Sequence, residues 1–199
     1  MTLTPWLIRP YSLVVAGLLA AAFAMPSHAA DWDIDQLMHG LAQTRSAQAR
    51  FVEKKTIAIL DQPVESSGEL LYTAPDRLEK RTIKPKPESM VVEGDQLEIE
   101  RGRQKIKLQL QAYPELAAFI DSIRGTLAGD RKALERNYQL SLEGSAQAWT
   151  LKLVPIDSKM KQVVALIRMT GVRDEIRSID VTQVDGDSSL MSIEKVAAK

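Results

Sequence analysis

The chain has 199 residues, in which 26 lysines and arginines balance 26 aspartates and glutamates, and it contains no cysteine. The balanced charge argues against a nucleic-acid-binding protein, which needs a basic surface to neutralise phosphates. The lack of cysteine excludes disulfide bonds and thiol chemistry, so stability has to come from burial of apolar side chains.

Residues 1–29 have the features of a secretory signal peptide. Arg9 precedes an apolar run from Leu13 to Ala24, and the small residues Ser27 and Ala29 form a cleavage pattern. The run is too short to cross the ~30 Å hydrocarbon core of a bilayer, and no cysteine follows it that could be lipidated. We therefore expect cleavage after Ala29, which leaves one exported domain of residues 30–199 in the periplasm.

The exported part opens with a predicted helix over residues 33–45. Ile34, Leu37, Met38 and Leu41 recur at helical spacing and define one apolar face. Aspartates at the start of this segment lie at the positive end of the helix dipole.

Strand patterns follow, separated by turn residues. The first group is predicted at residues 51–60, 68–73, 77–83, 88–93, 96–101 and 104–110. Gly94-Asp95 and Gly102 fit hairpin turns. In the last of these strands, apolar residues alternate with lysine and glutamine, which predicts one buried face.

A helical insertion then interrupts the strands. Pro114 is typical of a first helical turn, Gly125 and Gly129 are candidate terminators, and Asp130 can cap a second short helix that ends near Arg136. Strand patterns resume at residues 138–142, 149–153, 163–169, 176–184 and 190–196. The succession predicts an α+β fold: one curved antiparallel sheet of about eleven strands, with an N-terminal helix and a helical segment covering its concave face.

No residues with catalytic or metal-binding spacing stand out. His39 is the one histidine after residue 29, and it lies within the predicted helix. The aspartates at 31, 33 and 35 resemble the start of a calcium loop, but Gln36 and Ala42 occupy the positions where such a loop needs Gly and Glu. We therefore expect no enzyme activity, no metal site and no cofactor.

The order of these elements resembles that of the LolA-type periplasmic lipoprotein carriers over nearly all of residues 30–199. The matching segments are Phe51 to Lys54, Gly68 to Tyr72, Pro75 to Leu78, Pro85 or Pro87, Met90 to Val92 and Gly94 to Leu97. The helical insertion at 114–136 falls where that family has its lid helices.

The resemblance implies an unclosed β-barrel, covered by helices, whose apolar interior holds lipoprotein acyl chains in transit between membranes. It also implies an inner-membrane exporter and an outer-membrane acceptor as partners, and a protein that acts as a monomer. The family's arginine before the proline that follows the second strand, which holds the lid shut, is replaced by Ala74, and Arg77 is the nearest substitute. Leu70, Leu71 and Tyr72 stand where the family often has Trp and Phe. The carrier fold is therefore expected more firmly than the lipoprotein cargo.

Strand alternation assigns eight residues to the apolar wall that would bind the ligand: Leu70, Tyr72, Leu78, Met90, Val92, Ile106, Leu108 and Leu110. Leu70 and Leu71 cannot both face inward, and Leu70 is preferred because it shares its face with Tyr72. The lid is assigned to the apolar face of the helical insertion: Leu116, Phe119, Ile120 and Ile123. Without an arginine at position 74, this apolar contact is expected to hold the lid.

Two functions remain open. The first is a periplasmic carrier or chaperone that holds the acyl chains of a lipoprotein or another amphiphilic lipid and ferries it between the inner and outer membranes. The alternative is an envelope sensor or protein-interaction module that uses the same half-barrel without lipid transfer. Each inward apolar residue can be a ligand wall or ordinary packed core.

Overall fold

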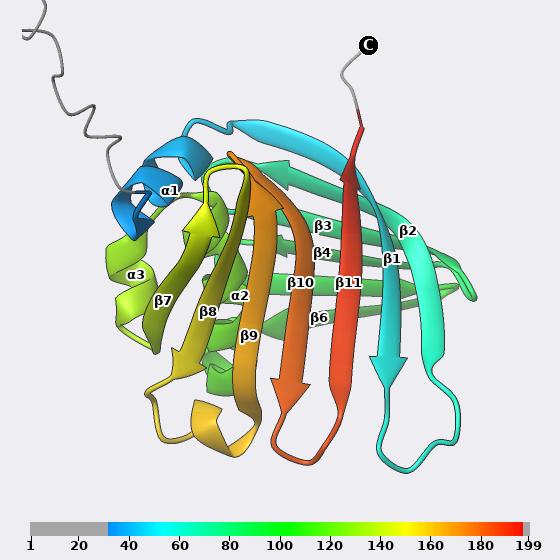
Figure 1. Cartoon of the computed structure of the whole chain (residues 1–199). Coiled ribbons are helices and arrows are strands. Elements are labelled where there is room, and N and C mark those ends of the chain that lie inside the picture. Colours follow the sequence, from blue (N-terminus) through cyan, green and yellow to red (C-terminus); the bar gives the residue numbers. More distant parts are fainter. Residues whose placement is uncertain (1–31, 197–199) are drawn as a thin grey trace, which may run out of the picture. The chain divides into compact units, whose positions relative to one another are not determined.

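The computed structural model describes residues 32–196, which form one antiparallel sheet and a few helices (Figure 1). The helices are α1 (Ile34–Leu41), η1 (Leu110–Ala112), α2 (Pro114–Leu127), α3 (Arg131–Glu135) and η2 (Met160–Gln162). The strands are β1 (Ser46–Thr56), β2 (Val64–Thr73), β3 (Arg77–Lys84), β4 (Glu88–Glu93), β5 (Gln96–Arg101), β6 (Gln104–Gln109), β7 (Tyr138–Ser145), β8 (Ala148–Pro155), β9 (Val164–Val172), β10 (Glu175–Gln183) and β11 (Ser188–Lys195). The predicted signal peptide and its cleavage site lie outside the described residues. No helix within 32–196 combines the length and the apolar character that crossing a membrane requires.

The eleven strands form a single open sheet in the order β6-β5-β4-β3-β2-β1-β11-β10-β9-β8-β7. The first and last strands, β1 and β11, pair in the middle of the sheet, so the edges are β6 and β7. These edge strands are consecutive in the chain, and η1, α2 and α3 connect them. The connection therefore has to run from one edge of the sheet to the other. The single open antiparallel sheet, with its N-terminal helix and helical connection, confirms the predicted fold class.

The apolar side chains gather in two clusters rather than one. The larger cluster joins α1 to β7–β10 and includes Leu37, Trp149 and Ile167, all fully buried. The smaller joins β4, β5, η1 and α2 through Val92, Leu97, Leu110 and Ile120. Phe119 of α2 packs against both clusters. In Figure 1, β3, β4 and β6 run across the view, and β7–β10 pass in front of α2.

The predicted N-terminal helix is correct in position but too long. Asp33 caps α1 by accepting a hydrogen bond from the Gln36 backbone N–H at 2.8 Å, and the helix ends at Leu41 instead of residue 45. It ends early because β1 begins at Ser46, where the backbone pairs with Thr73 of β2. The sheet takes up the backbone hydrogen-bonding groups that a longer helix would have used.

The first predicted strand is displaced along the chain. It was placed at residues 51–60, whereas β1 covers Ser46–Thr56, because its ladders with β2 and β11 lie over these residues. Residues 57–60 form a turn closed by a 2.8 Å hydrogen bond from the Leu60 N–H to the Ile57 carbonyl. The other predicted strands agree with the observed ones to within a few residues, except that Leu110 lies in η1.

Gly68 is needed where β2 and β3 approach closely. The β2–β3 register shifts between Ser67 and Gly68. A Cβ atom at position 68 would lie 1.9 Å from the carbonyl oxygen of Arg81 in β3, a contact that only movement of the backbone could relieve.

Replacing Gly68 with alanine should therefore lower the free energy of unfolding by about 1–3 kcal/mol, the usual cost of forcing an extra group into a packed site. The matched control is Gly40→Ala in α1, where a Cβ atom would make an ordinary 3.8 Å contact with Asp174. Alanine also suits a helix better than glycine, so the control should be neutral or slightly stabilising. Urea denaturation of both variants tests this, and a Gly68→Ala protein as stable as the control would contradict it.

Candidate functional site: an apolar cavity under helix α2

An apolar cavity of about 270 Å³ lies between α2 and the strands. Its lining comes from α1, α2, β1–β5, β10 and β11, so it occupies the space between the two core clusters. An apolar cavity of roughly 150 Å³ already admits a molecule of the size of benzene. This one is therefore large enough to accept part of an aliphatic chain.

Small side chains on β1 account for the hollow. Ala47 pairs with Tyr72 of β2, and Ala49 pairs with Leu70, so both alanines share the face of these cavity-lining residues. Two residues further along the same face, Phe51 is buried and lies outside the cavity lining. The small side chains of Ala47 and Ala49 thus leave space for the cavity over one part of β1, and the large side chain of Phe51 fills the space over the next part.

Five of the eight predicted wall residues lie in the lining: Leu70, Tyr72, Leu78, Met90 and Val92. Their strands pair in a register that puts them on one face, with Tyr72 opposite Leu78 and Leu78 opposite Val92. Leu71 also borders the cavity, although alternation assigns its side chain to the face opposite that of Leu70. That these residues bind a ligand remains a prediction.

The other three predicted wall residues, Ile106, Leu108 and Leu110, lie outside the cavity, and their assignment is corrected. Ile106 and Leu108 pair with Ile99 and Leu97 and so lie on the predicted face. However, β6 is the edge strand, where Ile106 is 43% exposed, while Leu108 and Leu110 pack in the smaller core cluster. Alternation identified the face correctly but could not reveal the position of the strand in the sheet.

All four predicted lid residues of α2 line the cavity: Leu116, Phe119, Ile120 and Ile123. Leu127, one turn further along α2, lies there too and was not predicted. Leu41 of α1 and Ile193 of β11 are further lining residues that the sequence analysis did not assign, and they come from segments far from residues 70–123 in the chain.

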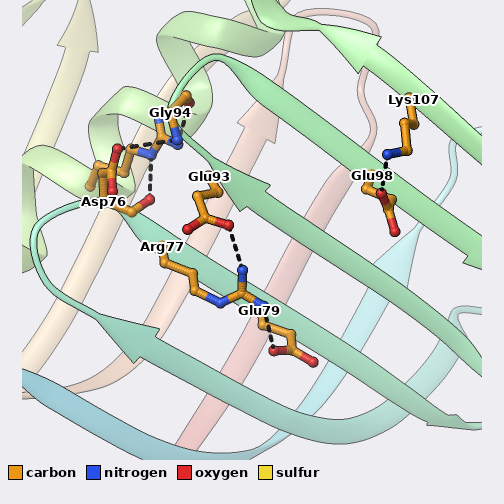
Figure 2. Close-up of polar contacts among 8 residues, drawn as sticks. Asp76, Arg77, Glu79, Glu93, Gly94, Glu98 and Lys107 are labelled. Carbon is orange, nitrogen blue, oxygen red and sulfur yellow. Dashed lines mark hydrogen bonds and ion pairs between the residues drawn. The ribbon is translucent and has the colours of Figure 1, made fainter.

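Helix α2 is fixed to the sheet by an arginine of its own. The Arg124 side chain is 13% exposed; its Nε donates to the Asp76 carbonyl at 3.0 Å and its Nη2 to the Gly94 carbonyl at 2.6 Å. These carbonyls belong to the β2–β3 and β4–β5 turns. The turns are themselves joined, because the Gly94 N–H donates to the Asp76 carboxylate at 3.1 Å (Figure 2). Apolar contact is thus supplemented by two charge-assisted hydrogen bonds.

A tyrosine makes a second polar contact with α2. Tyr138 of β7 donates its hydroxyl proton to the carbonyl of Ala118 at 3.1 Å. Burial raises the pKa of Tyr138 to about 12, so the phenol keeps its proton and remains a donor at neutral pH. The polar contacts of α2 with the sheet therefore involve both halves of the sheet.

The profile of the outer membrane lipoprotein carrier protein LolA-like family matches residues 24–198. The chain belongs to this family. No curated protein sequence matches it. The crystal structure of a LolA superfamily protein from Nitrosomonas europaea is similar, at 12% identity and a TM-score of 0.46, with 83% of this chain and 92% of that chain covered. Lipoprotein LppX of Mycobacterium tuberculosis is 9% identical, with a TM-score of 0.45 and coverages of 81% and 91%. A third structure, the Pseudomonas aeruginosa MucA/MucB complex, is 15% identical, with a TM-score of 0.45 and coverages of 83% and 56%.

In this LolA-like protein, position 74, where the family has its arginine, and Arg77, the nearest substitute, both make contacts within the sheet and its loops. Ala74 donates its backbone N–H to the Arg45 carbonyl at 2.8 Å. Arg77, the proposed substitute, forms a 2.7 Å ion pair with Glu93 and a longer one with Glu79 (Figure 2). Arg77 precedes the cavity-lining Leu78 on β3, so its side chain is assigned to the opposite face, and it is absent from the cavity lining. Among the described residues, the side-chain partners of Arg77 are thus two glutamates of the sheet.

The acidic and histidine residues of α1 serve the helix. Asp33 is its N-cap, Asp35 forms an ion pair with Arg131 at 3.0 Å, and His39 is exposed in the last turn. Among residues 32–196 there is no group of three or more His, Cys, Asp or Glu side chains placed to hold a metal ion.

Replacing Arg124 with methionine keeps the aliphatic stem but removes both hydrogen bonds to the turns. We expect a loss of about 1.5–3 kcal/mol in the free energy of unfolding, and faster amide hydrogen exchange in α2 than in the wild type. The control is Arg131→Met, which removes exposed ion pairs with Asp35 and Glu135 and should change stability by less than about 0.5 kcal/mol. Unchanged exchange in α2 of the Arg124→Met protein would show that Arg124 does not hold the helix.

Proposed function

We propose that this LolA-like protein is a periplasmic carrier that shelters the acyl chains of a lipoprotein or another amphiphilic lipid between the inner and outer membranes. The observation that carries the proposal is the apolar cavity under α2, between the two core clusters. In this proposal residues 30–199 act as a monomer. An inner-membrane exporter transfers the lipid to this monomer, and an outer-membrane acceptor removes it. The protein performs no chemical step on its cargo.

The cavity suits acyl chains because its wall is mostly apolar. Each methylene transferred from water to such a wall contributes about 0.8 kcal/mol, so eight of them would contribute about 6 kcal/mol. Contacts with such residues depend on the apolar area buried rather than on hydrogen-bond geometry. Examples in the lining are Leu70, Met90, Ile120, Ile179 and Met191. Such a wall can hold chains of different lengths and branching, as a carrier of several cargoes requires.

The way α2 is attached supports loading and release. Its polar contacts are few: Arg124 binds two turn carbonyls, and Tyr138 binds the Ala118 carbonyl. Turn carbonyls can exchange such partners for water when the helix moves. The remaining contacts of α2 with the cavity are apolar, and an incoming acyl chain replaces them with contacts of the same kind.

Filling the cavity at Ala49 tests the proposal. We expect Ala49→Leu to weaken binding of the apolar fluorescent probe N-phenyl-1-naphthylamine at least tenfold. The affinity for 1-lauroylglycerol, measured by displacement of the probe, should fall by at least the same factor. The free energy of unfolding should stay the same or rise by about 1 kcal/mol, because the added methyl groups occupy a void. Loss of binding without loss of stability distinguishes a ligand cavity from ordinary core.

The matched control is Val52→Leu, which enlarges a half-exposed side chain on the opposite face of the same strand. It should bind the probe and the monoacylglycerol as the wild type does. A wild-type protein that binds neither compound, or an Ala49→Leu protein that binds both as well as Val52→Leu does, would refute the carrier proposal.

A further inference from the structure

Lys80 lies between apolar residues in the cavity wall, whose other charged residues are Glu79, Asp174, Glu175 and Lys195. On β3 it pairs with Leu70 of β2 on one side and with Met90 of β4 on the other, and all three line the cavity. Its ammonium nitrogen lies 4.9 Å from the centroid of the Phe51 ring. The side chain is 26% exposed, so neighbouring residues cover most of it.

The partner of Lys80 is Glu53 of β1, which is held by side chains from three other strands. It forms an ion pair with Lys80 of β3, accepts a 2.7 Å hydrogen bond from the Ser189 hydroxyl of β11, and a 3.3 Å one from the Ser66 hydroxyl of β2. Burial raises the pKa of Glu53, but the hydrogen bonds from Lys80, Ser189 and Ser66 outweigh it and hold this pKa below its ordinary value. The carboxylate is therefore ionised at neutral pH, and the pair carries no net charge.

The ammonium group has donors left over. A lysine side chain carries three N–H donors, and within residues 32–196 the hydrogen-bond acceptor of Lys80 is Glu53. The neighbouring lining residues Leu70 and Met90 offer no oxygen acceptor. A ligand in the cavity can supply one, and a hydrogen bond from a charged donor is stronger than one between neutral groups.

The charge state of the pair decides which acceptor fits. An ionised headgroup beside Lys80 would also lie near the Glu53 carboxylate, and two anions repel strongly in a medium of low dielectric constant. An amide would bring an N–H donor, but the Glu53 oxygens already accept from three donors. An ester carbonyl brings an acceptor with neither a charge nor a donor.

We propose that Lys80 and Glu53 form a headgroup subsite that binds the ester carbonyl of an esterified acyl chain and rejects the carboxylate of a free fatty acid. This inference rests on the proposed carrier function and specifies its ligand class. Lys80 donates the hydrogen bond, and Glu53 supplies the selectivity by neutralising Lys80 and repelling a second anion. The apolar wall binds the chain itself.

The test compares laurate with 1-lauroylglycerol, which share one acyl chain, as displacers of N-phenyl-1-naphthylamine at pH 8. The wild type should bind the ester at least tenfold more tightly than laurate. Lys80→Met should weaken ester binding about tenfold, the effect of losing one hydrogen bond from a charged donor. Glu53→Gln leaves the Lys80 charge unopposed, so laurate should become the tighter ligand.

Two further variants keep the test decisive. The double variant Lys80→Met, Glu53→Gln buries no unpaired charge, and its affinities for laurate and ester should differ by less than about threefold. The control Lys107→Met breaks a 3.1 Å ion pair with Glu98 outside the cavity lining (Figure 2) and should keep the wild-type preference. Far-UV circular dichroism confirms that each protein is folded.

The outcomes separate this inference from the carrier proposal. If the wild type binds neither compound, the carrier function fails and the headgroup subsite fails with it. If the wild type binds both, but the double variant and Glu53→Gln keep the wild-type preference, the cavity binds acyl chains and the headgroup subsite is refuted.

Discussion

The connection between the two edge strands is the constraint on which the rest of the structure depends. Because β1 pairs with β11 in the middle of the sheet, β6 and β7 become its opposite edges although they are consecutive in the chain. The segment between them must pass from one edge to the other. An amphipathic helix is suited to this path, because it can bury one face against the apolar side of the sheet and leave the other face in water.

This path divides the interior in two. Helix α2 packs with β4 and β5 on one side and contributes to the cluster of β7–β10 on the other, and Phe119 contacts both clusters. The central strand β1 lies between these clusters and presents Ala47 and Ala49 rather than large side chains. Helix α2 packs against a cluster on each side but does not fill the space over Ala47 and Ala49 between the clusters, so this space remains hollow. The cavity is thus a consequence of the topology combined with two small residues.

Much of the fold could be predicted from the sequence because its signals are local. Alternation and turn residues located most strands to within a few positions, and Pro114 marked the start of α2. The positions of Leu70, Tyr72, Leu78, Met90 and Val92 in the cavity lining follow from the same alternation. Each of these features depends on neighbours within about ten residues.

The features that alternation missed depend on non-local geometry. The place of Ile106 outside the cavity reflects the edge position of β6, which strand order determines. Arg124 escaped notice because its acceptors are backbone carbonyls, which leave no mark in the sequence. The Glu53 cluster joins residues up to 136 positions apart. The weak apolar character of Ala47 and Ala49 hid the start of β1 and with it the origin of the cavity.

The central claim of the proposal is that the cavity holds one amphiphile during transit, and native mass spectrometry of the protein purified without detergent tests it most directly. The account predicts a species heavier than the apoprotein by the mass of one esterified lipid, which dissociates on activation and is absent from Ala49→Leu purified in parallel. Wild-type protein that carries only its own mass, with no lipid in its organic extract, would contradict the account.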